Sequence, residues 1–87
     1  MDNNDKITFE DYDRALASVL LAEKKALGIN FTDIALVSGI KYQQVMRLMN
    51  GKRPMQFSEM VALCRALNMA TSEAAQRTEV LVENMSS

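Results

Sequence analysis

Residues 30–53 read NFTDIALVSGIKYQQVMRLMNGKR, and this pattern predicts two short helices joined by a tight turn. Asn30 can cap the first helix, which ends at Gly39. The second helix begins near Tyr42 and stops at Asn50, before a glycine that suits a helix terminus. Its apolar residues recur on one side only, so this helix is expected to bury one face and expose the other.

Two helices that meet at a steep angle need a small residue where their backbones approach, a turn residue that tolerates positive φ, and apolar residues on the inner side. The spacing Ala-x3-Gly-x5-Val-x2-Leu supplies these residue types and is that of the helix-turn-helix, although a short helix pair in another bundle can match it by chance. We therefore predict a helix-turn-helix at residues 31–50, with a core formed by Ile34, Ala35, Gly39, Ile40, Val45 and Leu48.

Apolar residues also recur at helical spacing on both sides of this segment. A helix is expected over residues 8–28, another over 57–68, and a last one capped by Thr71 or Ser72. No alternating strand pattern and no internal repeat occurs in the sequence. The predicted fold class is all-α, a compact bundle of about five helices.

The chain of 87 residues has room for one domain. Residues 1–6 are expected to be a flexible tail, residues 7–70 the helix-turn-helix domain, and residues 71–87 a C-terminal helix. The apolar stripe of this last helix is longer than the core requires, so it is a candidate homodimer surface formed by Leu81, Val82 and Met85. In the alternative, the stripe packs only on its own subunit.

Composition excludes several function classes. The chain has no histidine and one cysteine, so the usual zinc sites and histidine-dependent catalytic triads cannot form. We predict no enzyme activity, no metal or other cofactor and no small-molecule ligand, and we expect Cys64 to pack as a small hydrophobe. The absence of a long apolar run and of a signal-peptide pattern argues against a membrane and predicts a cytoplasmic protein of a bacterial cell or phage-infected host.

Charge is distributed unevenly along the chain. The net charge of −1 gives no overall attraction to phosphates. Residues 1–33 carry seven acids against four bases and residues 59–87 carry four against two, whereas residues 34–58 carry four bases and no acid. This basic middle is either a solvated face or a nucleic-acid contact, and its members are Lys41, Arg47, Lys52 and Arg53.

Residues 30–53, followed by the helix expected at 57–68, resemble the phage lambda repressor and Cro type (XRE-like) of helix-turn-helix DNA-binding domain. The closing residues Leu48-Met-Asn-Gly-Lys-Arg53 match best, and the likeness extends over roughly residues 10–70. The resemblance implies an all-α bundle of about five helices that binds double-stranded operator DNA, usually as a homodimer, with its third helix in the major groove.

The resemblance also implies contact residues by position. Base contacts fall on Tyr42, Gln43, Gln44 and Arg47, and contacts with the DNA backbone fall on Lys41, Asn50, Lys52 and Arg53. Gln43 and Arg47 are the strongest candidates, because glutamine can form two hydrogen bonds with adenine and arginine two with guanine. Asn50 serves equally well as a helix cap, and Gln43 has the alternative of being a plain surface residue.

Three positions depart from the family pattern. Phe31 stands where a polar residue often contacts a phosphate, so that contact is expected to be missing. Met49 replaces a frequent acid, which suggests an apolar seam with the first helix. Lys41 replaces a common Ser or Thr cap, so the cap of the second helix of the pair is expected to be weak.

We predict a sequence-specific transcriptional regulator, in the manner of a small phage repressor or Cro-like protein. The alternative is an acidic helix-turn-helix interaction module that binds another regulator or a toxin, as an antirepressor or antitoxin does. Salt dependence distinguishes the two. Four cations on phosphates give a slope of log affinity against log salt concentration of about −4 per protomer, whereas an apolar protein contact does not.

Overall fold

A computed structural model describes residues 6–86, whose elements are α1 (Phe9–Leu27), α2 (Phe31–Ser38), α3 (Tyr42–Met49), α4 (Phe57–Ala66) and α5 (Thr71–Ser86). No strand occurs in these residues, so the prediction of an all-α bundle of about five helices is confirmed. The tail predicted at residues 1–6 falls outside the described residues, apart from Lys6.

Local capping fixes both ends of α1. The Thr8 hydroxyl accepts a hydrogen bond from the Asp11 N–H (3.2 Å), and the Asp11 carboxylate accepts one from the Thr8 N–H (2.9 Å). This reciprocal pair satisfies two N–H groups that a helix start otherwise leaves without partners. At the other end, Gly28 adopts the left-handed conformation (φ 72°) and ends the helix.

The helix-turn-helix has the predicted boundaries. The Asn30 side chain accepts a hydrogen bond from the Asp33 N–H (2.8 Å) and caps α2. Gly39 ends α2 with φ 77°, and its N–H donates to the Ala35 carbonyl (2.9 Å). Lys41 precedes α3 without a side-chain cap, as its sequence predicts.

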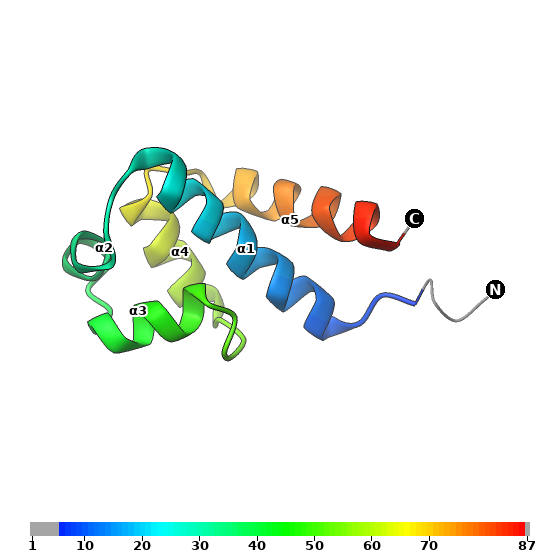
Figure 1. The fold of residues 1–87 in the computed structure, drawn as a ribbon, viewed down its shortest axis with the longest axis horizontal. Helices are drawn as coiled ribbons and strands as arrows, with labels where there is room; N and C mark the ends of the chain where they lie inside the picture. Colours follow the sequence, from blue (N-terminus) through cyan, green and yellow to red (C-terminus); the bar gives the residue numbers. More distant parts are fainter. Residues whose placement is uncertain (1–5, 87) are drawn as a thin grey trace.

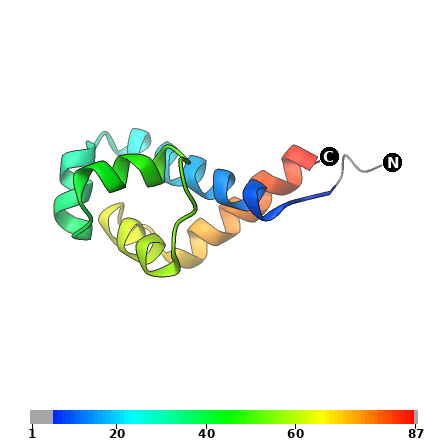
Figure 2. The same cartoon turned by 90° about the horizontal axis from the view of Figure 1, so that it is seen from below.

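The helix-turn-helix lies at one end of the molecule. Figure 1 shows α2, α3 and α4 grouped at the left, while α1 crosses the view and runs beside α5 toward the right. Figure 2, turned by 90°, also places α3 well away from the outer end of α5. The particle measures 46 × 20 × 20 Å, so the helix-turn-helix and the end of α5 lie at opposite ends of its long axis.

The residues predicted for the helix-turn-helix core lie on the inner side of the α2–α3 turn or next to it. Ile34, Val45 and Leu48 are fully buried, while Ala35 and Ile40 are half-buried and pack against the same cluster. The turn between α2 and α3 is therefore held by apolar contacts on its inner side, as the spacing of these residues predicts.

Met49 is also fully buried and belongs to the same core. It lines a groove with Ala17 and Leu21 of α1, so the predicted apolar seam between α1 and α3 is confirmed. This seam and the packing of α3 on α2 fix α3 relative to the rest of the bundle.

The inner face of α5 packs on α1. Ala74, Thr78 and Val82 lie at four-residue steps on this face and are buried. Of the three candidate dimer residues, Val82 packs within its own subunit. Leu81 is half-buried and Met85 is 57% exposed.

The predicted cap of α5 at Thr71 or Ser72 is wrong, because the helix already begins at Thr71. The Ala70 carbonyl accepts hydrogen bonds from the N–H groups of Glu73 and Ala74, so Ala70 occupies the boundary position. Within residues 6–86, no helix is both long and apolar enough to cross a bilayer.

Candidate nucleic-acid interface

The outer face of α3 carries exposed polar side chains. Gln43 and Arg47 lie four residues apart, so they share this face, and both are exposed. Val45 is fully buried on the opposite side of the same helix. Asn50 is exposed at the end of α3, where its backbone N–H donates to the Met46 carbonyl (3.0 Å).

Tyr42 starts α3 beside an aromatic residue of α2. Its ring meets the ring of Phe31 edge to face, with the centroids 6.5 Å apart and an interplanar angle of 84°. The ammonium of Lys24 lies 4.4 Å from the centroid of Phe31. Phe31 therefore packs between α1 and α3. It provides no polar group for a phosphate, as expected from the identity of this residue.

Lys24 is a residue that the sequence interpretation missed. It precedes Phe31 by seven residues, across the end of α1, and no periodic pattern joins two side chains over such a break. The available signal was the position of Lys24 in the last turn of α1, next to the start of α2.

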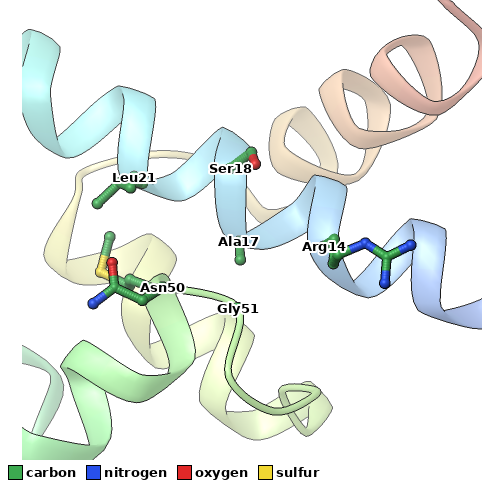
Figure 3. Close-up of a pocket in the computed structure, with 7 residues that line it drawn as sticks. Arg14, Ala17, Ser18, Leu21, Asn50 and Gly51 are labelled. Atoms are coloured by element: carbon green, nitrogen blue, oxygen red, sulfur yellow. The ribbon is translucent and has the colours of Figure 1, made fainter. Parts of the chain in front are cut away.

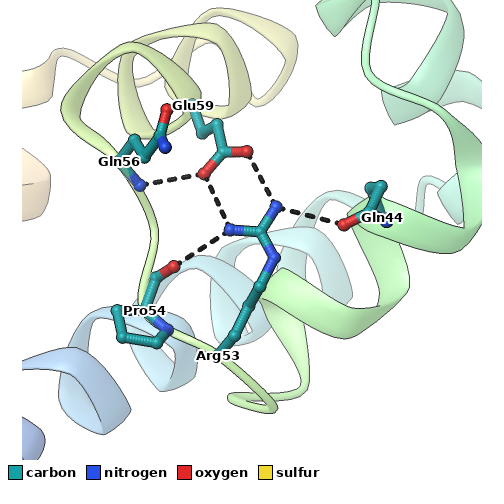
Figure 4. A network of polar contacts seen from close by, with 5 residues as sticks. All are labelled: Gln44, Arg53, Pro54, Gln56 and Glu59. Carbon is teal, nitrogen blue, oxygen red and sulfur yellow. Dashed lines mark hydrogen bonds and ion pairs between the residues drawn. The ribbon is translucent and has the colours of Figure 1, made fainter.

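Gln44 and Arg53, both predicted to contact DNA, are joined to each other in the network drawn in Figure 4. One terminal nitrogen of Arg53 donates to the Gln44 side-chain carbonyl (3.1 Å) and to one carboxylate oxygen of Glu59 (2.8 Å). The other donates to the second oxygen of Glu59 (3.2 Å) and to the Pro54 carbonyl (3.2 Å). The N–H of Gln56 also donates to Glu59 (2.9 Å), which completes the N-terminal cap of α4.

This network fixes the charge state of its members. Hydrogen bonding from Arg53, followed by the N–H of Gln56, holds the pKa of Glu59 below its ordinary value. The bond to Glu59 in turn raises the pKa of Arg53. Both side chains are therefore charged at neutral pH, and the positive charge of Arg53 is balanced within the protein.

Three of the four predicted basic residues keep an unbalanced charge. Lys41, Arg47 and Lys52 are exposed, and within residues 6–86 none of them forms an ion pair. Lys41 lies at the start of α3, Arg47 on its outer face and Lys52 after its end. The three cations therefore surround the polar side chains of that helix. This arrangement suits contacts with an anionic backbone on either side of a base-reading helix.

A shallow groove separates α1 from the end of α3 (Figure 3). Asn50 and Gly51 form one side, and Arg14 and Ser18 line the other. The Arg14 side chain points away from Asn50 in Figure 3 and forms an ion pair with Asp11 (2.9 Å). Arg14 therefore adds no unbalanced charge to the exposed face of α3.

Acidic side chains limit the basic area on this side. Glu10 and Asp13 of α1 line a depression together with Lys52. A phosphate moving from α3 toward the start of α1 would approach these carboxylates and be repelled. The region favourable to an anionic backbone thus ends near Lys52.

Two observations concern metal binding and thiol chemistry in the described residues. Within residues 6–86 no group of three or more His, Cys, Asp or Glu side chains could hold a metal ion. Cys64 is 1% exposed in the core, and burial raises the pKa of its thiol. A thiol in this position is a core side chain and a poor nucleophile at neutral pH.

A helix-turn-helix with an exposed polar face on its second helix defines a class of DNA-binding proteins. The model of the Cro/C1-type HTH DNA-binding domain family matches residues 18–78, so the chain belongs to this family. The family match confirms the resemblance of residues 30–53 to this type and supports a DNA-binding regulator in general. No curated protein and no solved structure matches the chain.

Proposed function

We propose that the protein is a sequence-specific transcriptional regulator, of the small phage repressor or Cro-like kind, that occupies operator DNA with α3 in the major groove. The observation that carries this proposal is the outer face of α3, where Gln43 and Arg47 are both exposed opposite the buried Val45. Such a regulator would act on DNA in the cytoplasm of a bacterial or phage-infected cell.

Base recognition in this proposal rests on two side chains. Gln43 can form two hydrogen bonds with the N6 and N7 groups of adenine, and Arg47 can form two with O6 and N7 of guanine. Each such pair discriminates against a wrong base by about 1–3 kcal/mol. Tyr42 is 48% exposed and can place its hydroxyl against a phosphate or its ring against a thymine methyl group.

Positioning on the duplex falls to residues at the two ends of α3. Lys41 and Lys52 provide unbalanced charges there, and the amide of Asn50 can donate to a phosphate. These contacts carry no sequence information, but they set the register of α3 in the groove.

We further propose that the protein binds as a homodimer through α5, with Leu81 and Met85 as contacts. Val80 is 50% exposed on the same helix and adds apolar surface. A second copy of the chain is the favoured occupant, because a two-fold dimer presents two recognition helices to half-sites about 34 Å apart.

The deciding experiment is selection from a pool of random duplex DNA by the purified full chain, at roughly 0.1 M salt, followed by sequencing. We expect an enriched palindrome whose half-site centres are about one helical turn apart. Enrichment of a single half-site would retain DNA binding and reject the dimer. If no sequence is enriched, operator recognition is rejected.

A second candidate function has one observation in its favour. Leu36 and Val37 are consecutive large apolar residues of α2, and they are 78% and 67% exposed. They would suit a module that binds another regulator or a toxin through an apolar face. Substitution of Leu36→Lys and Val37→Lys would abolish such binding and would leave operator binding intact if the first proposal holds.

A further inference from the structure

Arg53 is the centre of a network that joins three elements of the structure. Its guanidinium lies between Gln44 of α3 and Glu59 of α4, and its own residue belongs to the loop that connects these helices. The Arg53 side chain is 31% exposed and that of Glu59 is 20% exposed. This partial burial makes the network more than a surface ion pair that exchanges freely with water.

The hydrogen-bonding capacity of Arg53 is nearly used up inside the protein. A guanidinium has five N–H donors, and its two terminal nitrogens carry four of them. Those two nitrogens donate to Pro54, to both oxygens of Glu59 and to Gln44. Rotation of Arg53 toward a phosphate would break these bonds and leave the Glu59 carboxylate without its cation.

Lys52, the preceding residue, offers a phosphate contact without this cost. It is exposed, and within residues 6–86 it forms no ion pair. A phosphate near the end of α3 would therefore bind Lys52 and leave the Arg53 network intact. This differs from the role that family resemblance implies for Arg53.

The network also orients the side-chain amide of Gln44. Because the carbonyl oxygen of this amide accepts from Arg53, its NH2 group points away from the guanidinium. Gln44 precedes Arg47 by three residues, so the two side chains are neighbours on α3. Within residues 6–86 the NH2 group of Gln44 donates to no protein acceptor, so its donors remain available outside the protein, whereas its carbonyl already accepts one hydrogen bond.

We propose that Arg53 is a positioning residue that contacts no phosphate, and that it presents Gln44 to DNA chiefly as a hydrogen-bond donor. A glutamine that reads adenine must donate to N7 and accept from N6 with the same amide. With its carbonyl turned toward Arg53, Gln44 donates to an acceptor, which can be O6 or N7 of guanine, N7 of adenine or O4 of thymine, and adenine loses the advantage of its second bond. The inference rests on the proposed function and specifies one base position of the operator.

Two variants separate the two parts of the inference. Arg53→Met combined with Glu59→Gln removes the ion pair without changing the net charge. Arg53→Lys keeps a cation beside Glu59 but lacks the second donor nitrogen that holds Gln44. Arg65→Met combined with Glu79→Gln is the matched control, because it also keeps the net charge and because both residues are exposed and form no ion pair within residues 6–86.

The test measures salt dependence and base preference on the DNA enriched by the wild-type chain. The double variant is expected to bind more weakly with an unchanged log-log salt slope, whereas loss of a phosphate contact would reduce the slope by about 0.9 per protomer. Arg53→Lys is expected to accept adenine at one position of each half-site, with a rise of roughly fivefold or more in relative affinity. Gln44→Leu removes the preference at that same position.

The outcomes are distinguishable. A reduced slope in the double variant overturns the positioning role, and an unchanged preference in Arg53→Lys overturns the donor role of Gln44. If the double variant fails to fold, as judged by circular dichroism, Arg53→Lys and Gln44→Leu still decide the second part and its dependence on Arg53. If the wild-type chain enriches no sequence, the proposed function falls and this inference falls with it.

Discussion

Gly39 is the residue that allows α2 and α3 to meet. Its φ of 77° lies in the left-handed region, and a Cβ built at this position has no atom within 4 Å. A side chain at this position would therefore lower the stability of the fold through the strained backbone conformation, and not through contacts with neighbouring atoms. There is room for a side chain at the turn, but the positive φ is unfavourable for any residue other than glycine.

We expect Gly39→Ala to lower the free energy of unfolding by about 1 kcal/mol, because an L-residue is strained at this φ. Gly39→Asn is the matched control and should lose less, since asparagine tolerates the left-handed region better than alanine. Urea unfolding followed by circular dichroism measures both. Equal stability of Gly39→Ala and the wild type would show that the turn does not require this conformation.

Arg47 is the residue on which base discrimination depends most in the proposal. It is exposed, so Arg47→Ala should leave the fold intact and weaken binding to the enriched DNA by about tenfold or more, as loss of a two-bond contact with guanine implies. Fluorescence anisotropy measures this affinity, with Arg65→Ala as the control for lost charge. An affinity within twofold of the wild type would remove Arg47 from the set of base contacts.

At the scale of elements, α4 begins at the Glu59 network. The pKa of Glu59 in the folded chain lies below the ordinary glutamate value of 4.5, chiefly through Arg53. A depressed pKa in the folded state means that the stabilising contribution is complete above the ordinary value and is lost as pH falls through the lower folded value. The start of α4 is thus sensitive to acid.

We therefore expect Glu59→Gln to be about 1 kcal/mol less stable than the wild type at neutral pH, from the weakened cap and ion pair. The difference should shrink as pH falls below about 4.5, where the wild-type carboxylate begins to be protonated in the unfolded chain. Urea unfolding at several pH values measures it, with the exposed Glu79→Gln as control. A difference that is independent of pH would contradict the role of the charge.

The helices could be predicted from sequence because their boundaries are set by local signals. Thr8, Asn30 and Gly39 act on neighbours within four residues, and each does so in the structure. The buried and exposed faces of α3 follow from the helical period for the same reason.

The parts of the site that sequence did not predict depend on contacts across loops. Arg53 reaches Gln44 over nine residues and Glu59 over six, through a turn whose path no periodicity describes. The cap of α5 was misassigned because Thr71 and Ser72 are both common cap residues, whereas the backbone of Ala70 forms the boundary. The capping-box spacing of Gln56 and Glu59 was the one available signal for the network.

At the scale of the whole molecule, few charges are available for phosphates. The net charge is −1, and Arg53 is balanced by Glu59. Arg47 is assigned to a base, so Lys41 and Lys52 remain for phosphates. With about 0.9 counterions released per phosphate neutralised, the slope of log affinity against log salt concentration should be about −1.8 per protomer. Affinity measured at several salt concentrations checks this value. A slope of about −2.7 or steeper would mean that Arg53 or another cation also contacts the backbone.

The shape of the molecule limits how two subunits can bind one operator. The helix-turn-helix and the end of α5 lie at opposite ends of a 46 Å axis. An end-to-end dimer would place the two α3 helices near opposite ends of a particle longer than one subunit. Half-sites about 34 Å apart therefore require subunits that lie side by side along α5.

A dimer of this kind should depend on the exposed apolar side chains of α5. Met85→Glu introduces a charge on a residue that is 57% exposed, so it should separate the subunits without unfolding them. Ser72→Glu adds the same charge at the exposed start of α5 and is the control. Sedimentation equilibrium should find dimers for the wild type and Ser72→Glu, and monomers for Met85→Glu. A monomeric wild type at micromolar concentrations would exclude the dimer in the absence of DNA and leave pairing of the subunits to the operator itself.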